Sequence, residues 1–275
     1  PAPLRQTNWA ANDLWWGHAA GTDAAGQQHL YDERLAREGA GLAGVTTDPL
    51  SVWLENWQMR ANGDAFPWQL RAETEDFSFS LAVSPVKPAV LQGDRGLSQK
   101  GAEPGNASYY YSMTRLETSG RITVRGVDYR VNGLSWLDRE WGTTLLSEDQ
   151  QGWDWFSLQF TSGEELMYYR LRDKHGNPHP NSLGSWVARD GTATTIGPED
   201  IELTPLSWWT APNGVKYAVS WRIQCKPLQR EWVVNAVLPD QLMAVSIPYW
   251  EGAVIVQDSR SGEELGRGFL EMTGE

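Results

Sequence analysis

The sequence predicts an all-β protein whose antiparallel sheets form sandwiches or barrels. Apolar and polar residues alternate over short runs, which is the pattern of strands with one buried face. Gly, Asn, Asp or Pro separates nearly all of these runs, and strands punctuated this regularly are typical of antiparallel sandwiches and barrels. Few stretches show a sustained helical period. We expect two antiparallel halves, divided near residue 175.

The predicted strands follow one another along the whole chain. Residues 77–83 alternate until they reach Pro85, and residues 121–125 place two aliphatic side chains on one face before Gly126. Residues 153–160 and 165–172 predict a hairpin around a short polar turn that contains glycine. Further strands are predicted at 185–189, 217–224, 231–237, 253–257 and 266–273.

Three segments are less regular. Residues 32–38 fit a short helix or a strand equally well. Residues 90–106 contain four glycines and a proline, and a loop of this length in a compact chain is often a lid or a binding loop. Residues 173–181 read as a hairpin tip or a domain connection and include His175 and His179. Two histidines with no further ligand nearby are a weak metal signal, so we expect no bound metal.

Charge and composition exclude several classes of protein. The chain has 35 acidic against 23 basic residues, for a net charge of −12, so it lacks the basic surface of a nucleic-acid-binding protein. No apolar run approaches the length of a membrane-spanning helix. The single cysteine, Cys225, excludes an internal disulfide. Sixteen tryptophans indicate either an aromatic β-sheet core or an aromatic-lined cavity for an apolar small molecule.

The strongest candidate site combines two carboxylates with several tryptophans. In a strand over residues 133–142, the period of two places Trp136, Asp138 and Glu140 on one face, and Trp153 and Trp155 share a face of the next strand. Burial and like charge would raise the pKa of one carboxyl group and make it a proton donor, the catalytic role that we assign to these two acids.

A structural role for these carboxylates is the alternative. Asp138 or Glu140 would then form an ion pair with Arg115, Arg170 or Arg172, which would lower the carboxyl pKa instead of raising it.

Four further residues are candidate ligand-binding groups. Tyr110, within a run of three tyrosines, would supply a phenol to the cavity. His18 follows two tryptophans and is either a general base or a histidine satisfied within the barrel. Trp250 and Glu251 lie together near the C-terminal end, and Glu251 is a second candidate acid.

Several of these runs also resemble one family. The run 133–142, together with 152–155, is similar to the AttH-like, hydroxyneurosporene synthase (carotenoid hydratase) family of lipocalin-like proteins. Further similar runs, in the same order, lie at 91–101, 106–112, 249–253 and 268–274. The resemblance extends from about residue 13 to the end of the chain.

The resemblance implies two lipocalin-like β-barrel domains packed together, at residues 1–174 and 175–275. It also implies a cavity near the tyrosine-rich and Asp-x-Glu runs, and export to the periplasm or the medium. The family's opening Glu-Trp-Trp-Tyr signature is absent, so the first part of the N-terminal domain is expected to be missing. The pigment hydratases carry a Tyr-x-Asp arrangement and a His-x-Trp pair. Here Asp138 matches the aspartate, Trp136 occupies the tyrosine position, and no His-x-Trp occurs.

Three functions are compatible with these features. The first is a hydratase or isomerase without a cofactor, in which a buried acid protonates a double bond of an isoprenoid-like or polyketide-like molecule and indoles stabilise the cation. The second is a lipid or pigment carrier with structural carboxylates. The third is a carbohydrate-active hydrolase, because paired carboxylates and tryptophans also suit sugars.

Overall fold

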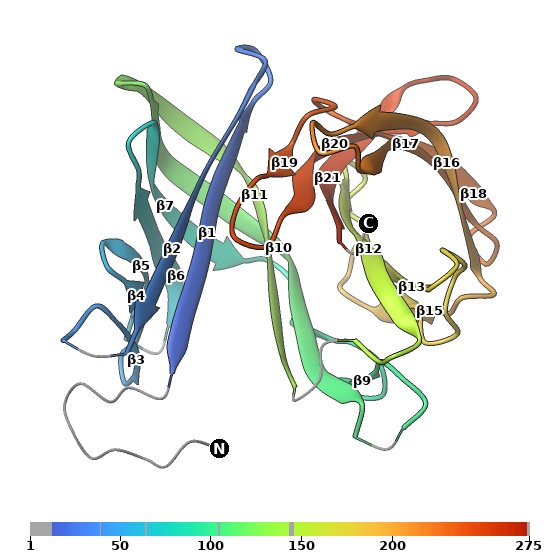
Figure 1. Cartoon of the computed structure of the whole chain (residues 1–275), viewed down its shortest axis with the longest axis horizontal. Coiled ribbons are helices and arrows are strands. Elements are labelled where there is room, and N and C mark those ends of the chain that lie inside the picture. Colours follow the sequence, from blue (N-terminus) through green and yellow to red (C-terminus); the bar gives the residue numbers. More distant parts are fainter. Residues whose placement is uncertain (1–12, 39, 64, 104, 143–145, 274–275) are drawn as a thin grey trace. The chain divides into compact units, whose positions relative to one another are not determined.

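The computed structural model describes residues 13–38, 40–63, 65–103, 105–142 and 146–273, and the prediction of an all-β protein is confirmed (Figure 1). The described residues contain strands and turns, and no helix that could cross a membrane occurs among them. The strands of the first half of the chain are β1 (Leu14–Asp23), β2 (Gln28–Arg37), β3 (Ala43–Thr47), β4 (Leu50–Leu54), β5 (Trp57–Asn62), β6 (Ala65–Glu73), β7 (Phe77–Pro85), β8 (Val90–Leu91), β9 (Leu97–Gln99), β10 (Ala107–Val124) and β11 (Val127–Gly142). The strands of the second half are β12 (Gln150–Phe160), β13 (Glu165–Asp173), β14 (Leu183–Val187), β15 (Ala193–Ile196), β16 (Ile201–Thr210), β17 (Lys216–Cys225), β18 (Arg230–Ala236), β19 (Leu242–Met243), β20 (Tyr249–Asp258) and β21 (Glu264–Met272).

The strands form three sheets. β1 and β2 pair with each other, and a nine-stranded sheet runs in the order β11-β10-β7-β6-β5-β4-β3, with β8 and β9 added along β10. A ten-stranded sheet has the order β15-β14-β13-β12-β21-β20-β18-β17-β16, with β19 added along β20. Most neighbours are hairpins of consecutive strands, while β21 inserts between β12 and β20.

The chain divides into two compact units that are each made of separate segments. Unit 1 comprises residues up to Gly21, Leu30–Val86 and Arg115–Ser135, and unit 2 comprises Thr22–His29, Lys87–Thr114 and Trp136 onward. The long strands β10 and β11 contribute to both units because each crosses a unit boundary part-way along its length. The predicted division between residues 174 and 175 falls within unit 2, in the turn after β13.

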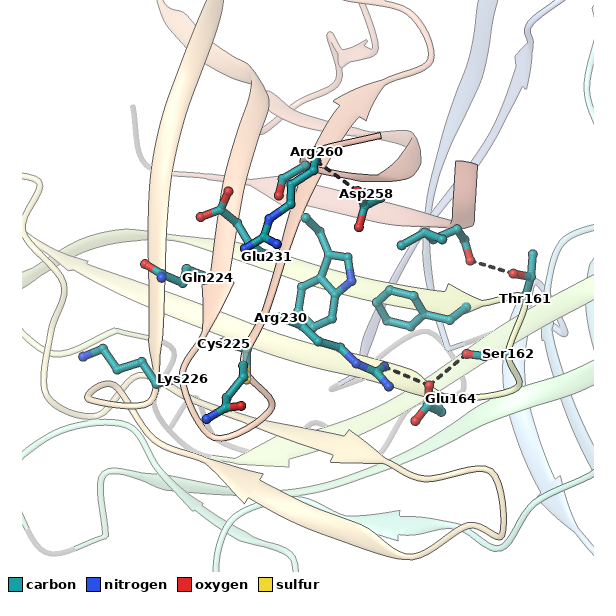
Figure 2. Close-up of a pocket in the computed structure, with 15 residues that line it drawn as sticks. Thr161, Ser162, Glu164, Gln224, Cys225, Lys226, Arg230, Glu231, Asp258 and Arg260 are labelled. Carbon is teal, nitrogen blue, oxygen red and sulfur yellow. Dashed lines mark hydrogen bonds and ion pairs between the residues drawn. The ribbon is translucent and has the colours of Figure 1, made fainter. Parts of the chain in front are cut away.

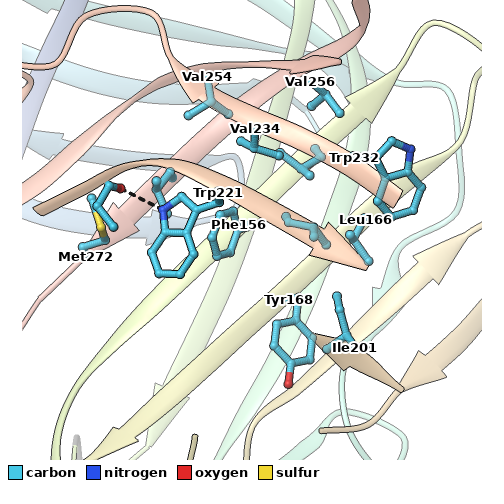
Figure 3. Packing of buried hydrophobic residues seen from close by; sticks show 14 of the residues in the cluster. Phe156, Leu166, Tyr168, Ile201, Trp221, Trp232, Val234, Val254, Val256 and Met272 are labelled. Carbon is cyan, nitrogen blue, oxygen red and sulfur yellow. Dashed lines mark hydrogen bonds between the residues drawn. The ribbon is translucent and has the colours of Figure 1, made fainter. Parts of the chain in front are cut away.

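Unit 2 holds the largest group of buried apolar side chains, which we call the main core (Figure 3). Phe156 and Leu158 of β12, Trp221 of β17 and Trp232 of β18 are almost completely buried there. The ring of Phe156 meets Trp221 edge to face with centroids 5.6 Å apart, an arrangement that aromatic quadrupoles favour. Four of the sixteen tryptophans are therefore buried in the main core, which agrees with one of the two interpretations of the composition.

Local predictions have mixed outcomes. The predicted hairpin forms as β12 and β13, with Trp155 opposite Tyr169. Residues 32–38 are strand for most of their length, since β2 ends at Arg37, which settles the open choice for that segment. The predicted loop at 90–106 contains the short strands β8 and β9, which pair with β10.

Candidate functional site

A cavity of about 240 Å³ lies in unit 2, on the side of the β12–β13 hairpin that faces away from the main core. Residues of β10 and β11 and the residue after β9 form part of its wall, and residues of β12 and β13 form the rest. We call it the indole cavity, and its lining residues are Lys100, Ser108, Tyr110, Glu140, Trp141, Gly142, Trp153, Trp155, Tyr169 and Leu171.

Strand alternation directs two tryptophans of β12 into this cavity. Successive side chains of a strand point to opposite faces, so the face that carries Phe156 into the main core leaves Trp153 and Trp155 on the other side. There, Trp155 stands opposite Tyr169, and Trp153 stands opposite Leu171 of β13. The hairpin therefore separates an apolar core from an aromatic cavity.

Asp138 of β11 reaches this cavity through the phenol of Tyr110. The Tyr110 hydroxyl donates a hydrogen bond to Asp138 Oδ2 at 2.7 Å, and Trp136 Nε1 donates to Asp138 Oδ1 at 2.8 Å. Trp155 Nε1 in turn donates to the Tyr110 oxygen at 3.1 Å. Tyr110 lines the indole cavity, whereas Asp138 and Trp136 do not.

The acidity of this pair is strongly perturbed. Burial raises the pKa of Asp138 to about 6, although hydrogen bonds from Ser112, Tyr110 and Trp136 oppose the rise. The pKa of Tyr110 is also raised well above its usual value, because the phenolate would be buried next to Asp138. The carboxyl group can therefore carry a proton close to neutral pH, while the phenol remains protonated.

Glu140 lines the cavity beside a buried lysine. Lys100 Nζ lies 2.9 Å from Glu140 Oε1, and the Ser108 hydroxyl donates to the same oxygen. Burial lowers the pKa of Lys100, while the charge of Glu140 acts in the opposite direction. The wall thus contains an acceptor and a cation side by side.

A further acid, Glu271, stands next to the cavity and was not among the predicted site residues. Trp153 Nε1 donates to Glu271 Oε1 at 2.7 Å, and Glu271 pairs across the sheet with Trp155 on one side and Glu251 on the other. Burial, followed by the charge of Glu251, raises the pKa of Glu271 to about 7. Glu271 lies beside the cavity because β21 pairs with β12, and a local strand pattern does not reveal pairing between segments so far apart in the sequence.

Two of the three arginines of the alternative interpretation bind a different carboxylate. Arg170 and Arg172 both form ion pairs with Asp154, whose side chain is almost fully buried. Asp154 alternates with Trp153 and Trp155, so it lies on the opposite face of β12. The partner of Glu140 is Lys100 instead, which directly follows β9, a strand paired with β10.

The remaining predicted residues occupy other places. His18 belongs to unit 1, where its Nε2 lies 3.1 Å from Glu33 Oε1. Trp250 is fully buried in the main core and donates to the Pro239 carbonyl, so it does not line the indole cavity. Glu251 accepts a hydrogen bond from the Tyr249 hydroxyl at 3.2 Å and stands opposite Glu271 in the sheet. No group of three or more potential metal ligands occurs among the described residues.

A second pocket, of about 770 Å³, opens among the turns of unit 2 (Figure 2). Phe160 and Trp232 line it together with many charged side chains. Arg230 lies 2.9 Å from Glu164, so these two charges largely satisfy each other. None of the predicted site residues lines this pocket.

Comparison with known proteins identifies the family of the chain. The AttH-like family matches residues 2–275. The crystal structure of a candidate AttH protein from Nitrosomonas europaea is 32% identical, with a TM-score of 0.85 over 96% of this chain and 84% of that one. Kievitone hydratase from Nectria haematococca is 16% identical, with a TM-score of 0.72 over 94% of this chain and 80% of that one, and therefore shares the fold. No curated protein sequence is significantly similar. The chain belongs to the AttH-like family.

Proposed function

We propose that this protein is a hydratase without a cofactor, which adds water to a carbon–carbon double bond of an apolar, isoprenoid-like or polyketide-like molecule. The observation that carries the proposal is the Asp138–Tyr110 pair: an acid with a raised pKa hydrogen-bonded to a phenol on the wall of an aromatic cavity. A general acid works best when its pKa lies near the working pH, and burial brings Asp138 into that range.

Proton transfer would use the two groups as a relay. When Asp138 is protonated, its hydroxyl donates to the Tyr110 oxygen, and the phenol hydrogen is free to turn into the cavity. Tyr110 then gives this hydrogen to one carbon of the double bond and takes the Asp138 proton in return. The net change is a protonated substrate and an ionised Asp138, with Tyr110 still a phenol.

Water completes the reaction at the cation. The oxygen of a water molecule forms a bond to the carbocation carbon, and its surplus proton passes to the Glu140 carboxylate on the cavity wall. Proton exchange with solvent then restores Glu140 and Asp138, so that H and OH have been added across the double bond. Trp153 and Trp155 offer their π faces to the transient cation.

One comparison supports the reaction type, and the size of the cavity bears on the substrate. The fold is shared with a protein named kievitone hydratase, so water addition is known on this architecture. The cavity is small compared with the 300–1,000 Å³ of ordinary ligand sites. Trp141, which is half-exposed, lies at its edge. An elongated ligand would therefore place only its reacting end inside.

The test begins with protein purified from its own host, in which native mass spectrometry identifies any apolar molecule that is bound. That molecule and its dehydrated form are then incubated with the protein, and the product is examined for the mass of one added water. Asp138→Asn and Tyr110→Phe should each lower the rate at least about 100-fold and change ligand affinity only a few-fold.

Asp190→Asn is the matched control, because Asp190 is an exposed turn residue of the same unit, and its rate should equal that of the wild type. A bound molecule that is never converted would overturn the hydratase proposal and favour the carrier.

A further inference from the structure

The indole cavity is chemically two-sided. Trp153, Trp155 and Leu171 form an apolar wall from β12 and β13, whereas Lys100, Ser108 and Glu140 bring a cation, a hydroxyl and a carboxylate. The hydration reaction assigned above uses Glu140 but gives no task to Lys100. A buried lysine on a ligand-sized cavity therefore needs a separate explanation.

Lys100 is fixed in position by its own backbone. Its amide donates to the Asn106 carbonyl at 2.9 Å, and its carbonyl accepts a hydrogen bond from the buried side chain of Gln150. The residue as a whole is only 8% exposed. These contacts hold the start of the side chain, so the ammonium group is placed at the cavity by the fold.

The surroundings of the ammonium group leave donor capacity for a ligand. Nζ lies 2.9 Å from Glu140 Oε1 and 3.8 Å from the centre of the Tyr169 ring. An ammonium group has three hydrogens. Glu140 accepts one of them, and the Tyr169 face attracts the charge without being a full hydrogen-bond acceptor. The side chain is only 10% exposed, so water has little access to this group, and this burial lowers the pKa of Lys100.

We propose that Lys100 binds an oxygen atom of the ligand, so that the ligand of the indole cavity is an apolar molecule carrying a carbonyl, phenol or hydroxyl group and not a bare hydrocarbon. This inference rests on the proposed function, because it assumes that the indole cavity is where the apolar ligand binds. The oxygen would lie at the Lys100 end, and the double bond would lie beside Tyr110.

The contrast between an oxygenated ligand and a hydrocarbon follows from desolvation. Any ligand that fills the cavity removes water from the ammonium group. An oxygen atom replaces the lost hydrogen bond, whereas a hydrocarbon leaves the donor unpaired, which is a penalty. Sites built to bond a ligand oxygen reject the analogue that lacks it more strongly than apolar pockets distinguish similar shapes.

The experiment compares two probes of nearly equal size, 2-naphthol and 2-methylnaphthalene, by equilibrium dialysis against the full chain. Wild-type protein should bind 2-naphthol at least about tenfold more tightly. Lys100→Met should reduce this preference to less than about twofold, mainly because it weakens the binding of 2-naphthol. Lys174→Met, at an exposed turn position, is the matched control and should keep the full preference.

Two further variants keep the result interpretable. If Lys100 is the donor, Tyr110→Phe should still prefer 2-naphthol. Loss of this preference in Tyr110→Phe would overturn the assignment of Lys100 as the donor. Lys100→Arg keeps the charge and the donors, so it should keep a preference of more than about threefold. It also reports on the site should Lys100→Met fail to fold, as judged by circular dichroism.

The remaining outcomes separate this inference from the proposed function. Equal binding of both probes to the wild-type protein would overturn the role of Lys100 while leaving the indole cavity an apolar site. Binding of neither probe would count against the indole cavity as an apolar ligand site, and against this inference with it.

Discussion

Asp138 and Glu271 hold their protons more tightly than ordinary carboxyl groups for the same two reasons. Each is partly buried, and each has another carboxylate within electrostatic range, Glu140 for Asp138 and Glu251 for Glu271. Each also accepts an indole N–H, from Trp136 and Trp153 respectively. The indoles orient the carboxyl groups but do not cancel the cost of ionising them, so both groups titrate near neutral pH.

Replacing Asp138 by Asn should change the pH dependence of stability in a defined direction. The folded pKa of Asp138 is raised from 3.8 to about 6, so the folded protein binds this proton more tightly than the unfolded chain. Wild-type stability therefore falls as the pH rises from 3.8 through 6, and the Asn variant escapes this loss. Denaturant unfolding at pH 4 and pH 7.5 measures the free energy of unfolding of both proteins. Between these two pH values, the difference in this free energy should shift by about 2 kcal/mol in favour of the variant. A shift of the opposite sign would indicate a stabilising partner for the ionised group.

Glu271→Gln should stabilise the protein increasingly as the pH rises from 4.5 through 7. The pKa of Glu271 is raised from 4.5 to about 7, so the wild type loses stability over this range because its folded state resists ionisation next to Glu251, and the neutral amide escapes the loss while still accepting from Trp153. Differential scanning fluorimetry should show a gain in melting temperature for the variant that is larger at pH 8.5 than at pH 4. Glu264→Gln is the control on the same strand, where Glu264 pairs with Arg267 near the surface, and it should give no gain at pH 8.5.

The sequence can group site residues most directly when they lie close along the chain. The period of two places Trp136 and Asp138 on one strand face, and the structure joins them by a hydrogen bond. Glu271 could not be found in this way, because Trp153 lies 118 positions from it. Lys100 lies in a segment predicted to be an unstructured loop, so nothing local places it beside Glu140.

At the scale of elements, the β12–β13 hairpin is the strand pair that sequence patterning describes best. The first part of β12 alternates between buried and less buried residues, and the turn before β13 contains Gly163 at φ +88°, a conformation that glycine adopts without strain. The segment between β7 and β10 was harder to predict, because β8 and β9 have only two and three residues. Such short strands are stabilised by pairing with β10, not by their own composition.

The connection after β7 is fastened to this hairpin by a buried ion pair. Lys87 Nζ lies 2.8 Å from Glu165 Oε2, and both side chains are nearly inaccessible. The same ammonium group donates to the carbonyls of Gly163 and Ala188. Because every hydrogen of this group has an acceptor, the pair is expected to be a structural anchor.

Lys87→Met should cost about 3–5 kcal/mol of unfolding free energy, because it leaves the Glu165 carboxylate buried without its cation. The double variant Lys87→Met with Glu165→Gln should recover part of this loss, and guanidinium denaturation measures both. Arg121→Ala is the contrasting case: Arg121 and Asp128 are each about half exposed, so its loss should cost less than about 1 kcal/mol. Equal costs for the two pairs would contradict the assignment of Lys87 as an anchor.

At the scale of the whole molecule, the two units differ in the size of their cores. Unit 2 contains the main core with several fully buried tryptophans, whereas the buried clusters of unit 1 are small, around Trp57 and around Leu54. The all-β class is evident from the sequence. The discontinuous units are not, because their boundaries cross β10 and β11, where the strand pattern continues without a break.

This difference should be visible in amide hydrogen exchange. Because local opening is easiest where little apolar surface is buried, the strands β3–β6 of unit 1 should exchange faster than β12, β17, β18 and β20. Mass spectrometry of peptides after timed exchange checks this. Equal protection in both units would show that unit 1 is stabilised by contacts other than its small cores.

The insertion of β21 between β12 and β20 has a consequence for biosynthesis. A ribosome must translate the whole of β13 to β20 before the segment that joins β12 to β20 is available. Until then, both strands present unpaired backbone edges in the growing polypeptide, which is the state most prone to wrong association. Folding of the ten-stranded sheet therefore cannot finish during synthesis of its earlier strands, and the nascent chain should depend on chaperones that shield strand edges until β21 emerges.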